Sequence, residues 1–259
     1  MQSATKMNSW LLNYPKAGDQ IRLFCLPYAG GGASVYRGWQ EAFPAEVGVY
    51  PLQLPGRENR ISEQPICSMQ ELVYALAEVV IPHLDRPFML FGHSLGARIA
   101  FELARHLRRV GERQPSRLIV SGSRAPHIPE PKPVHHLPDD AFIRELRRLA
   151  GTPETILQSR ELINLFLPML RADFTVDETY SCVEDKPLSC PITAFGGTKD
   201  TEAAQEEIEA WQFHTTGNVS LEMIDGDHFF VQTRRDILLP AVSTVLRQYV
   251  SQLVDLPQQ

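Results

Sequence analysis

The segment Gly92–Gly96, which reads GHSLG, joins an apolar run to an amphipathic helical pattern and constrains the fold more than any other feature. The preceding run, Phe88–Phe91, is apolar throughout and is predicted to be a buried strand. Two glycines give the small volume that a tight strand-to-helix turn needs, so we expect Ser94 to project its hydroxyl from that turn as a nucleophile. The alternative is an ordinary turn in which Ser94 caps the helix.

Strand and helix patterns alternate along most of the chain, which predicts a mainly parallel sheet with helices on both faces. The predicted strands are Ile21–Leu26, Val47–Leu54, Phe88–Phe91, Arg117–Ser121, Ile192–Gly196 and Ser220–Ile224. The predicted helices between and after them are Ser68–Leu84, Leu95–Val110, Glu202–Thr215 and Arg234–Leu253.

One interval is much longer than a normal crossover between parallel strands. It opens with the proline-rich stretch Pro126–Pro138 and continues with two helical patterns, Asp139–Gly151 and Arg160–Asp173. Long insertions at the carboxyl edge of a sheet are more often functional than structural. We therefore expect a core made of residues 1–125 and 189–259, with residues 126–188 forming a helical lid, although a longer structural crossover is the alternative.

Composition narrows the classes of function. The 259 residues carry a net charge of −6 with no long run of like charge, which predicts no nucleic-acid partner. No apolar stretch is long enough for a signal peptide or a membrane span. None of the four cysteines forms a C-x-x-C pair, so we expect reduced thiols, a cytoplasmic protein and no metal site. Nothing in the sequence demands more than a monomer.

A serine nucleophile needs a base to take its proton and an acid to orient that base. Asp200 follows the strand pattern ITAFGG and His228 follows SLEMIDG, so both are expected at strand ends, beside Ser94. The chain order Ser94, Asp200, His228 is the order of α/β-hydrolases. The competing acids are Asp225, Asp227 and Asp236, and the other seven histidines include His93, which we expect to point along the turn.

An attacked carbonyl also needs fixed N–H donors for its developing negative charge. The residue after the nucleophile supplies one, here the Leu95 amide. The second is expected from the glycine-rich loop Pro27–Gly32, where the Ala29 amide is the candidate. A phosphate-binding loop is the alternative, but this loop lacks the spacing of both common phosphate-binding motifs.

Seven segments together resemble type II thioesterases, the editing enzymes of nonribosomal peptide and polyketide synthesis. They are LPYAGGGASVYRGW (26–39), LPGRENR (54–60), GHSLGARIAFELA (92–104), SGSRAP (121–126), LFLPMLRADF (165–174), CPITAFGGTKD (190–200) and GDHFF (226–230). The family includes the medium-chain thioesterase of animal fatty acid synthase. The resemblance covers nearly the whole chain and implies an α/β-hydrolase fold with a lid.

The resemblance implies that Ser94, Asp200 and His228 are catalytic and that the Ala29 and Leu95 amides form the oxyanion hole. It also implies the substrate, an acyl thioester on the phosphopantetheine arm of a carrier protein, with no further cofactor. Leu162, Phe166, Met169 and Leu170 fall near one helical face, where acyl contact and simple packing are both open. We expect substrate contacts from Tyr28, Phe166, Met169, Leu170 and Phe229.

The chain contains no Gly-x-Asp-Ser segment of the kind that carries such an arm, so the carrier is expected to act in trans as a separate polypeptide or subunit. Three alternatives remain open. The first is a small-molecule carboxylesterase with the same catalytic residues, and the second is a medium-chain fatty acyl thioesterase of fatty acid synthase. The third is a non-catalytic module that docks carrier proteins.

Overall fold

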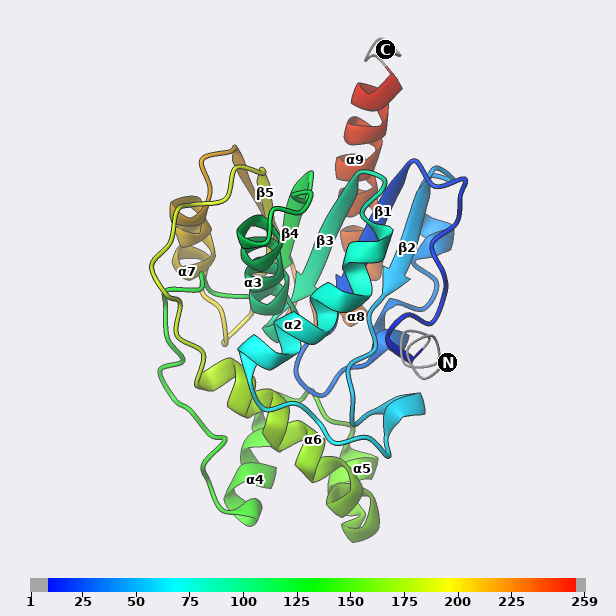
Figure 1. The fold of residues 1–259 in the computed structure, drawn as a ribbon. Helices are drawn as coiled ribbons and strands as arrows, with labels where there is room; N and C mark the ends of the chain where they lie inside the picture. The colour runs from blue at the N-terminus through cyan, green and yellow to red at the C-terminus, as the bar shows by residue number, and fades with distance from the viewer. Residues whose placement is uncertain (1–8, 255–259) are drawn as a thin grey trace.

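The computed structural model describes residues 9–254, and its centre is a six-stranded parallel sheet (Figure 1). The strand order is β2-β1-β3-β4-β5-β6, which confirms the predicted parallel α/β architecture. The strands are β1 (Ile21–Leu26), β2 (Val47–Pro51), β3 (Phe88–His93), β4 (Arg117–Ser121), β5 (Ile192–Gly197) and β6 (Val219–Ile224).

Strand β2 ends at Pro51, before the predicted boundary at Leu54. The amide of Leu52 still donates to the carbonyl of Cys25 on β1 at 2.8 Å, but Leu52 also pairs with Leu11 in an isolated antiparallel bridge. The amide of Gln53 also donates to the carbonyl of Trp10 at 2.8 Å. The apolar pattern continues past Pro51 because Leu52 and Leu54 stay buried after the ladder with β1 has ended.

Helices connect the strands and cover the sheet. They are α2 (Met69–Val80), α3 (Leu95–Arg109), α4 (Asp139–Leu149), α5 (Glu154–Gln158), α6 (Arg160–Glu178), α7 (Gln205–Glu209), α8 (Phe230–Thr233) and α9 (Arg235–Val254). No helix between residues 9 and 254 is long and apolar enough to span a membrane.

The predicted helix Glu202–Thr215 is partly wrong. Asp200 accepts hydrogen bonds from the amides of Glu202 (2.8 Å) and Ala203 (3.2 Å), so a turn occupies the predicted first residues. The α-helix α7 covers only Gln205–Glu209, and a 3-10 helix continues over Ala210–His214.

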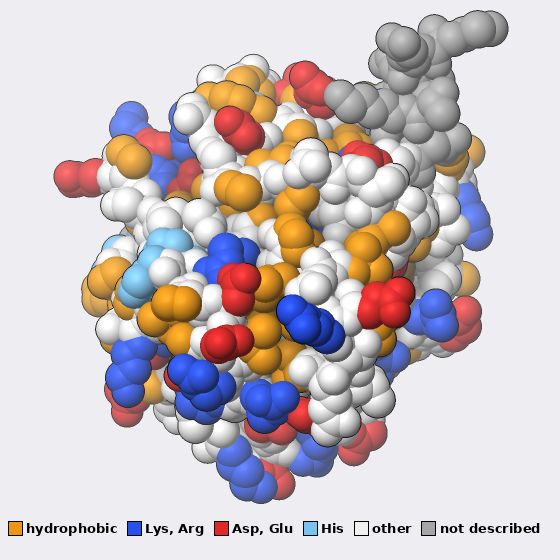
Figure 2. Space-filling view, turned by 90° about the horizontal axis from the view of Figure 1, so that it is seen from below, with side chains coloured by type: hydrophobic (Ala, Val, Ile, Leu, Met, Phe, Trp, Pro, Cys, Tyr) orange, Lys and Arg blue, Asp and Glu red, His pale blue; other side chains and the backbone are white. Residues whose placement is uncertain are grey.

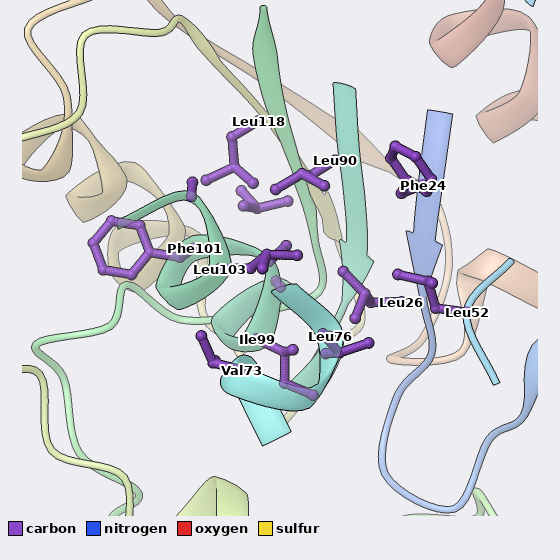
Figure 3. Close-up of a cluster of buried hydrophobic side chains, with 14 of the residues drawn as sticks. Phe24, Leu26, Leu52, Val73, Leu76, Leu90, Ile99, Phe101, Leu103 and Leu118 are labelled. Carbon is purple, nitrogen blue, oxygen red and sulfur yellow. The ribbon is translucent and has the colours of Figure 1, made fainter. Parts of the chain in front are cut away.

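Both faces of the sheet are buried, because helices α2 and α3 lie on one side and α9 lies on the other (Figure 1). Side chains alternate along each strand, so Phe24 and Leu26 join the cluster around α2 and α3, which Figure 3 shows. Leu23 and Cys25 join the opposite cluster with α9. This two-sided burial explains why the strands read as continuous apolar runs.

Residues 126–188, here called the lid segment, leave the sheet after β4 and return at β5. Helices α4, α5 and α6 lie beyond the carboxyl ends of the strands (Figure 1). They have a hydrophobic cluster of their own, which includes Phe142, Leu146 and Leu157. A separate cluster is what an independently packed insertion requires, and its action as a lid stays a prediction.

Substituting Leu103→Ala on α3 is expected to lower the free energy of unfolding by about 2–5 kcal/mol, since Leu103 is fully buried between helix and sheet. Val110→Ala at the end of the same helix, where the side chain is 51% exposed, should change it by about 0.5 kcal/mol or less. Urea denaturation followed by tryptophan fluorescence measures both, and equal effects would contradict this assignment of the core.

Candidate active site

Ser94 has a positive φ, a backbone conformation that residues with a side chain rarely adopt. Its φ of 54° and ψ of −121° place it in a sharp corner between β3 and α3. The corner is tight because a Cβ on Gly92 would lie 2.1 Å from the carbonyl oxygen of Gly96. A Cβ on Gly96 would lie 2.2 Å from the carbonyl oxygen of Leu26 on β1. Only glycine fits either place, so helix and sheet approach closely and Ser94 is presented at the crossing.

His228 and Asp200 meet at the neighbouring strand ends. The Nδ1 atom of His228 lies 2.9 Å from Oδ2 of Asp200, whose side chain is completely buried, while the His228 side chain is 14% exposed. The other carboxylate oxygen accepts the two backbone amides of the following turn. Because a carboxylate only accepts, Nδ1 carries a proton, and in the neutral form of this imidazole the lone pair is on Nε2.

The competing carboxylates have other partners. Asp227 accepts the amide of Phe229 at 2.9 Å and so shapes the turn. Asp225 pairs with Lys199 at 2.7 Å. Asp236 lies 3.6 Å from Arg234. Of the four acids that the sequence offered, Asp200 is the one that contacts the imidazole of His228.

His93 is a residue of the site that sequence reasoning missed. It is fully buried, its Nε2 lies 2.8 Å from the carbonyl oxygen of His228, and its Nδ1 lies 2.9 Å from the hydroxyl of Ser121. The carbonyl fixes the proton on Nε2, so His93 ties the backbone of the His228 loop to the ends of β3 and β4. Burial, and next the charge of His228, hold the pKa of His93 well below its ordinary value.

The two candidate oxyanion donors lie at the start of α3 and in the loop after β1. Leu95 is the first residue of α3, so its amide has no acceptor within the helix. Between residues 9 and 254, neither this amide nor that of Ala29 donates a backbone hydrogen bond outside the regular elements. Ala29 and Ser94 line the same pocket. Both amides are therefore available for an oxygen of a bound molecule.

This pocket opens between the sheet edge and the lid segment. Ser94, His228 and Ala29 line it, together with the predicted substrate contacts Tyr28 and Phe229. The lid segment adds an apolar wall that consists of Val134, Leu146, Leu149 and Phe174.

The structure places the other three predicted substrate residues elsewhere. Met169 and Leu170 belong to the lid segment's own hydrophobic cluster, Phe166 packs against that cluster, and none of the three lines the pocket. The helical spacing of apolar residues predicts which face of a helix is buried, but it does not predict which residues pack against that face.

Charged side chains also line the pocket, and several of them form ion pairs with one another. Arg124 bonds Glu130 at 2.8 Å, and Arg98 bonds Asp177 at 3.1 Å. Figure 2, seen from the lid-segment end, shows acidic and basic side chains mixed around apolar patches. In the part of the chain that the structure describes, no cluster of three or more His, Cys, Asp or Glu side chains could hold a metal ion.

Residues 21–246 match the family model of the thioesterase domain. The chain belongs to the thioesterase family. This thioesterase is also similar in structure to RedJ, described as a thioesterase from the prodiginine biosynthetic pathway of Streptomyces coelicolor. The TM-score is 0.83 at 42% identity, over 88% of this chain and 91% of that one. The predicted α/β-hydrolase fold and the resemblance to type II thioesterases are confirmed.

Two curated relatives have names that refer to gramicidin. The thioesterase is 46% identical to gramicidin S biosynthesis protein GrsT of Aneurinibacillus migulanus, over 89% of this chain and 91% of that protein. It is 43% identical to linear gramicidin dehydrogenase LgrE of Brevibacillus parabrevis, over 93% of this chain and 94% of that protein.

The second name contains the word dehydrogenase, but the glycine-rich loop of this chain lacks the glycine spacing of a dinucleotide-binding turn. A dinucleotide-binding turn needs the spacing G-x-G-x-x-G after its strand. Here Gly30, Gly31 and Gly32 are followed by Ala33, Ser34 and Val35, so the third glycine of that spacing is missing. The family match and the Ser94 corner agree with hydrolysis instead.

His93→Gln is expected to flatten the pH dependence of stability below about pH 6.5. Folded His93 stays neutral, because its pKa is well below the ordinary value, whereas the unfolded chain takes up a proton there. Stability contributed by neutral His93 is therefore lost as pH falls, at up to about 1.4 kcal/mol per pH unit. Urea denaturation at pH 7 and pH 5 measures the slope, and an identical slope in the variant would exclude this role.

Proposed function

We propose that this thioesterase hydrolyses acyl groups held as thioesters on the phosphopantetheine arm of a carrier protein of a nonribosomal peptide or polyketide synthase, acting in trans. The names of GrsT and RedJ, which refer to gramicidin S and prodiginine biosynthesis, support this substrate class. The observation that carries the proposal is that His228, which is hydrogen-bonded to Asp200, lines the same pocket as Ser94.

In the acylation step, the Nε2 atom of His228 takes the proton of the Ser94 hydroxyl while its oxygen attacks the thioester carbon. Asp200 holds the ring by its Nδ1–H and stabilises the imidazolium that forms. The oxyanion accepts the amides of Ala29 and Leu95. The C–S bond then breaks, the sulfur of the arm takes the proton from His228, and an acyl-serine remains.

In the second step, a water molecule replaces the thiol. His228 takes one proton from this water as its oxygen attacks the acyl-serine carbon, and the same oxyanion donors act again. Breaking the C–O bond returns the proton to the Ser94 oxygen and releases a carboxylic acid. These residues account for both steps without a metal or a redox cofactor.

Ser94→Ala should abolish hydrolysis of acyl-carrier and acyl-N-acetylcysteamine thioesters, and His228→Ala should be nearly as inactive. The triad acts as a unit, so either loss is expected to cost up to about a million-fold in kcat. Mass spectrometry of acylated carriers measures turnover, and circular dichroism checks the fold. Near-normal turnover by Ser94→Ala would refute the nucleophile.

The choice of substrate has its own test. The assay compares three substrates that carry the same acyl group: an oxygen ester, an acyl-coenzyme A thioester and an acylated carrier protein. We expect the highest kcat/KM for the acylated carrier protein. Preference for the oxygen ester would favour a small-molecule carboxylesterase. Exclusive hydrolysis of medium-chain acyl groups on a fatty acid synthase carrier would favour the alternative of a medium-chain fatty acyl thioesterase. An enzyme that a fluorophosphonate fails to label at Ser94 would be a docking module.

The proposal extends to location and assembly. We place the enzyme in the cytoplasm, because Cys25, Cys67, Cys182 and Cys190 are all free thiols. It acts as a monomer, since the residues proposed for catalysis all come from one chain. The lid segment covers the pocket, and the arm reaches Ser94 past Val134 and Phe174 on its inner wall.

A further inference from the structure

We infer that Asp173 and Arg57 are positioning residues, by which helix α6 of the lid segment holds the loop that carries the oxyanion donor Ala29. This inference rests on the proposed function, in which the Ala29 amide stabilises the transition state. Neither residue lines the pocket, so any effect on catalysis must pass through the backbone of the loop.

The loop after β1 begins with a tight turn. The amide of Gly31 donates to the carbonyl of Tyr28 at 2.9 Å, and Gly30 has a φ of +82°. These are the features of a type II turn with Ala29 and Gly30 at its centre. Type I and type II turns differ by a flip of the peptide that joins the two central residues. The flip changes ψ of Ala29 and φ of Gly30, so the direction of the Gly30 amide fixes the turn that directly follows the Ala29 N–H.

Asp173 accepts that amide. Its Oδ2 atom lies 2.7 Å from the nitrogen of Gly30, which holds the peptide in the type II orientation. One helical turn before Asp173, Leu170 packs on the same glycine, because a Cβ on Gly30 would lie 2.7 Å from its Cδ2 atom. Helix α6 thus contacts the centre of the turn with two side chains from one face.

Arg57 completes the arrangement from the loop after β2. Its two terminal nitrogens each lie 2.7 Å from an oxygen of Asp173, and Nη1 also donates to the carbonyl of Gly31 at 3.0 Å. Both charged side chains are 4% exposed. The guanidinium of Arg57 is therefore hydrogen-bonded both to the carboxylate of Asp173 and to the turn that contains Gly30.

A contribution to folding stability does not by itself explain why a buried ion pair of Arg57 and Asp173 is present here. Apolar residues of similar volume often replace a buried ion pair with no loss of stability, because burying both charges is costly. What such residues cannot supply is an acceptor for the Gly30 amide. The geometry therefore assigns the pair to the orientation of the turn.

Two double variants separate the acceptor from the charge. Both Arg57→Met/Asp173→Asn and Arg57→Met/Asp173→Leu lack the ion pair and leave no buried charge unpaired. The first keeps an oxygen for the Gly30 amide, whereas the second has none. Asp19→Asn is the control, since Asp19 is a buried carboxylate beside Arg22 at the opposite end of β1.

The Leu variant is expected to lose about tenfold or more in kcat with little change in KM, because removal of one oxyanion donor typically costs about 10²–10³ in kcat. The Asn variant should lose much less, and Asp19→Asn should keep kcat. An alkyl boronic acid mimics the oxyanion adduct at Ser94. Its affinity should fall most in the Leu variant, less in the Asn variant and not in Asp19→Asn. Equal kcat in the two double variants, whether both high or both low, would overturn the positioning role.

Amide hydrogen exchange gives a result that does not depend on activity. Exchange at Gly30 should be faster in the Leu variant than in the wild type and the Asn variant, and an unchanged rate would overturn the inference. If the wild-type protein hydrolyses no thioester and binds no boronic acid, the proposed function fails. The exchange rates would still decide whether Asp173 holds the turn.

Discussion

The close crossing of helix α3 over strands β1 and β3 is the constraint on which the site depends. At this crossing a Cβ on Gly92 or Gly96 would lie within 2.2 Å of backbone atoms, so there is room for backbone alone. This proximity forces Ser94 into its sharp corner and leaves the Leu95 amide at the start of the helix. The positions of the proposed nucleophile and of one proposed oxyanion donor thus follow from a single packing requirement.

Parallel strands bring the remaining groups to the same place. Because every strand runs in one direction, the segments after β1, β3, β5 and β6 all emerge at one edge of the sheet. Ala29, Ser94, Asp200 and His228 belong to these segments, although they are far apart in sequence. Hydrogen bonds then hold these segments in place. One example is the bond from His93 to the carbonyl oxygen of His228.

The lid segment contacts the proposed site at more than one place. Its helices α4 and α6 contribute Leu146 and Phe174 to the apolar wall of the pocket, and α6 also contacts the loop after β1 through Asp173. The same helix therefore contacts two parts of the proposed site. A displacement of α6 would alter the shape of the pocket and the support of the Gly30 turn together.

Local patterns in the sequence determined the order and type of most elements, since a strand buried on both faces must be apolar throughout and a covered helix must carry an apolar stripe. They also singled out Ser94, Asp200 and His228, because strand ends of a parallel sheet converge whatever the details. Tertiary structure alone decided that Met169 packs inside the lid segment, that Leu170 also contacts Gly30, and that His93, Arg57 and Asp173 contact the loops of the proposed site. Those roles depend on contacts between distant segments, such as residues 57 and 173, and no periodicity along the chain encodes which distant partner a buried side chain will meet.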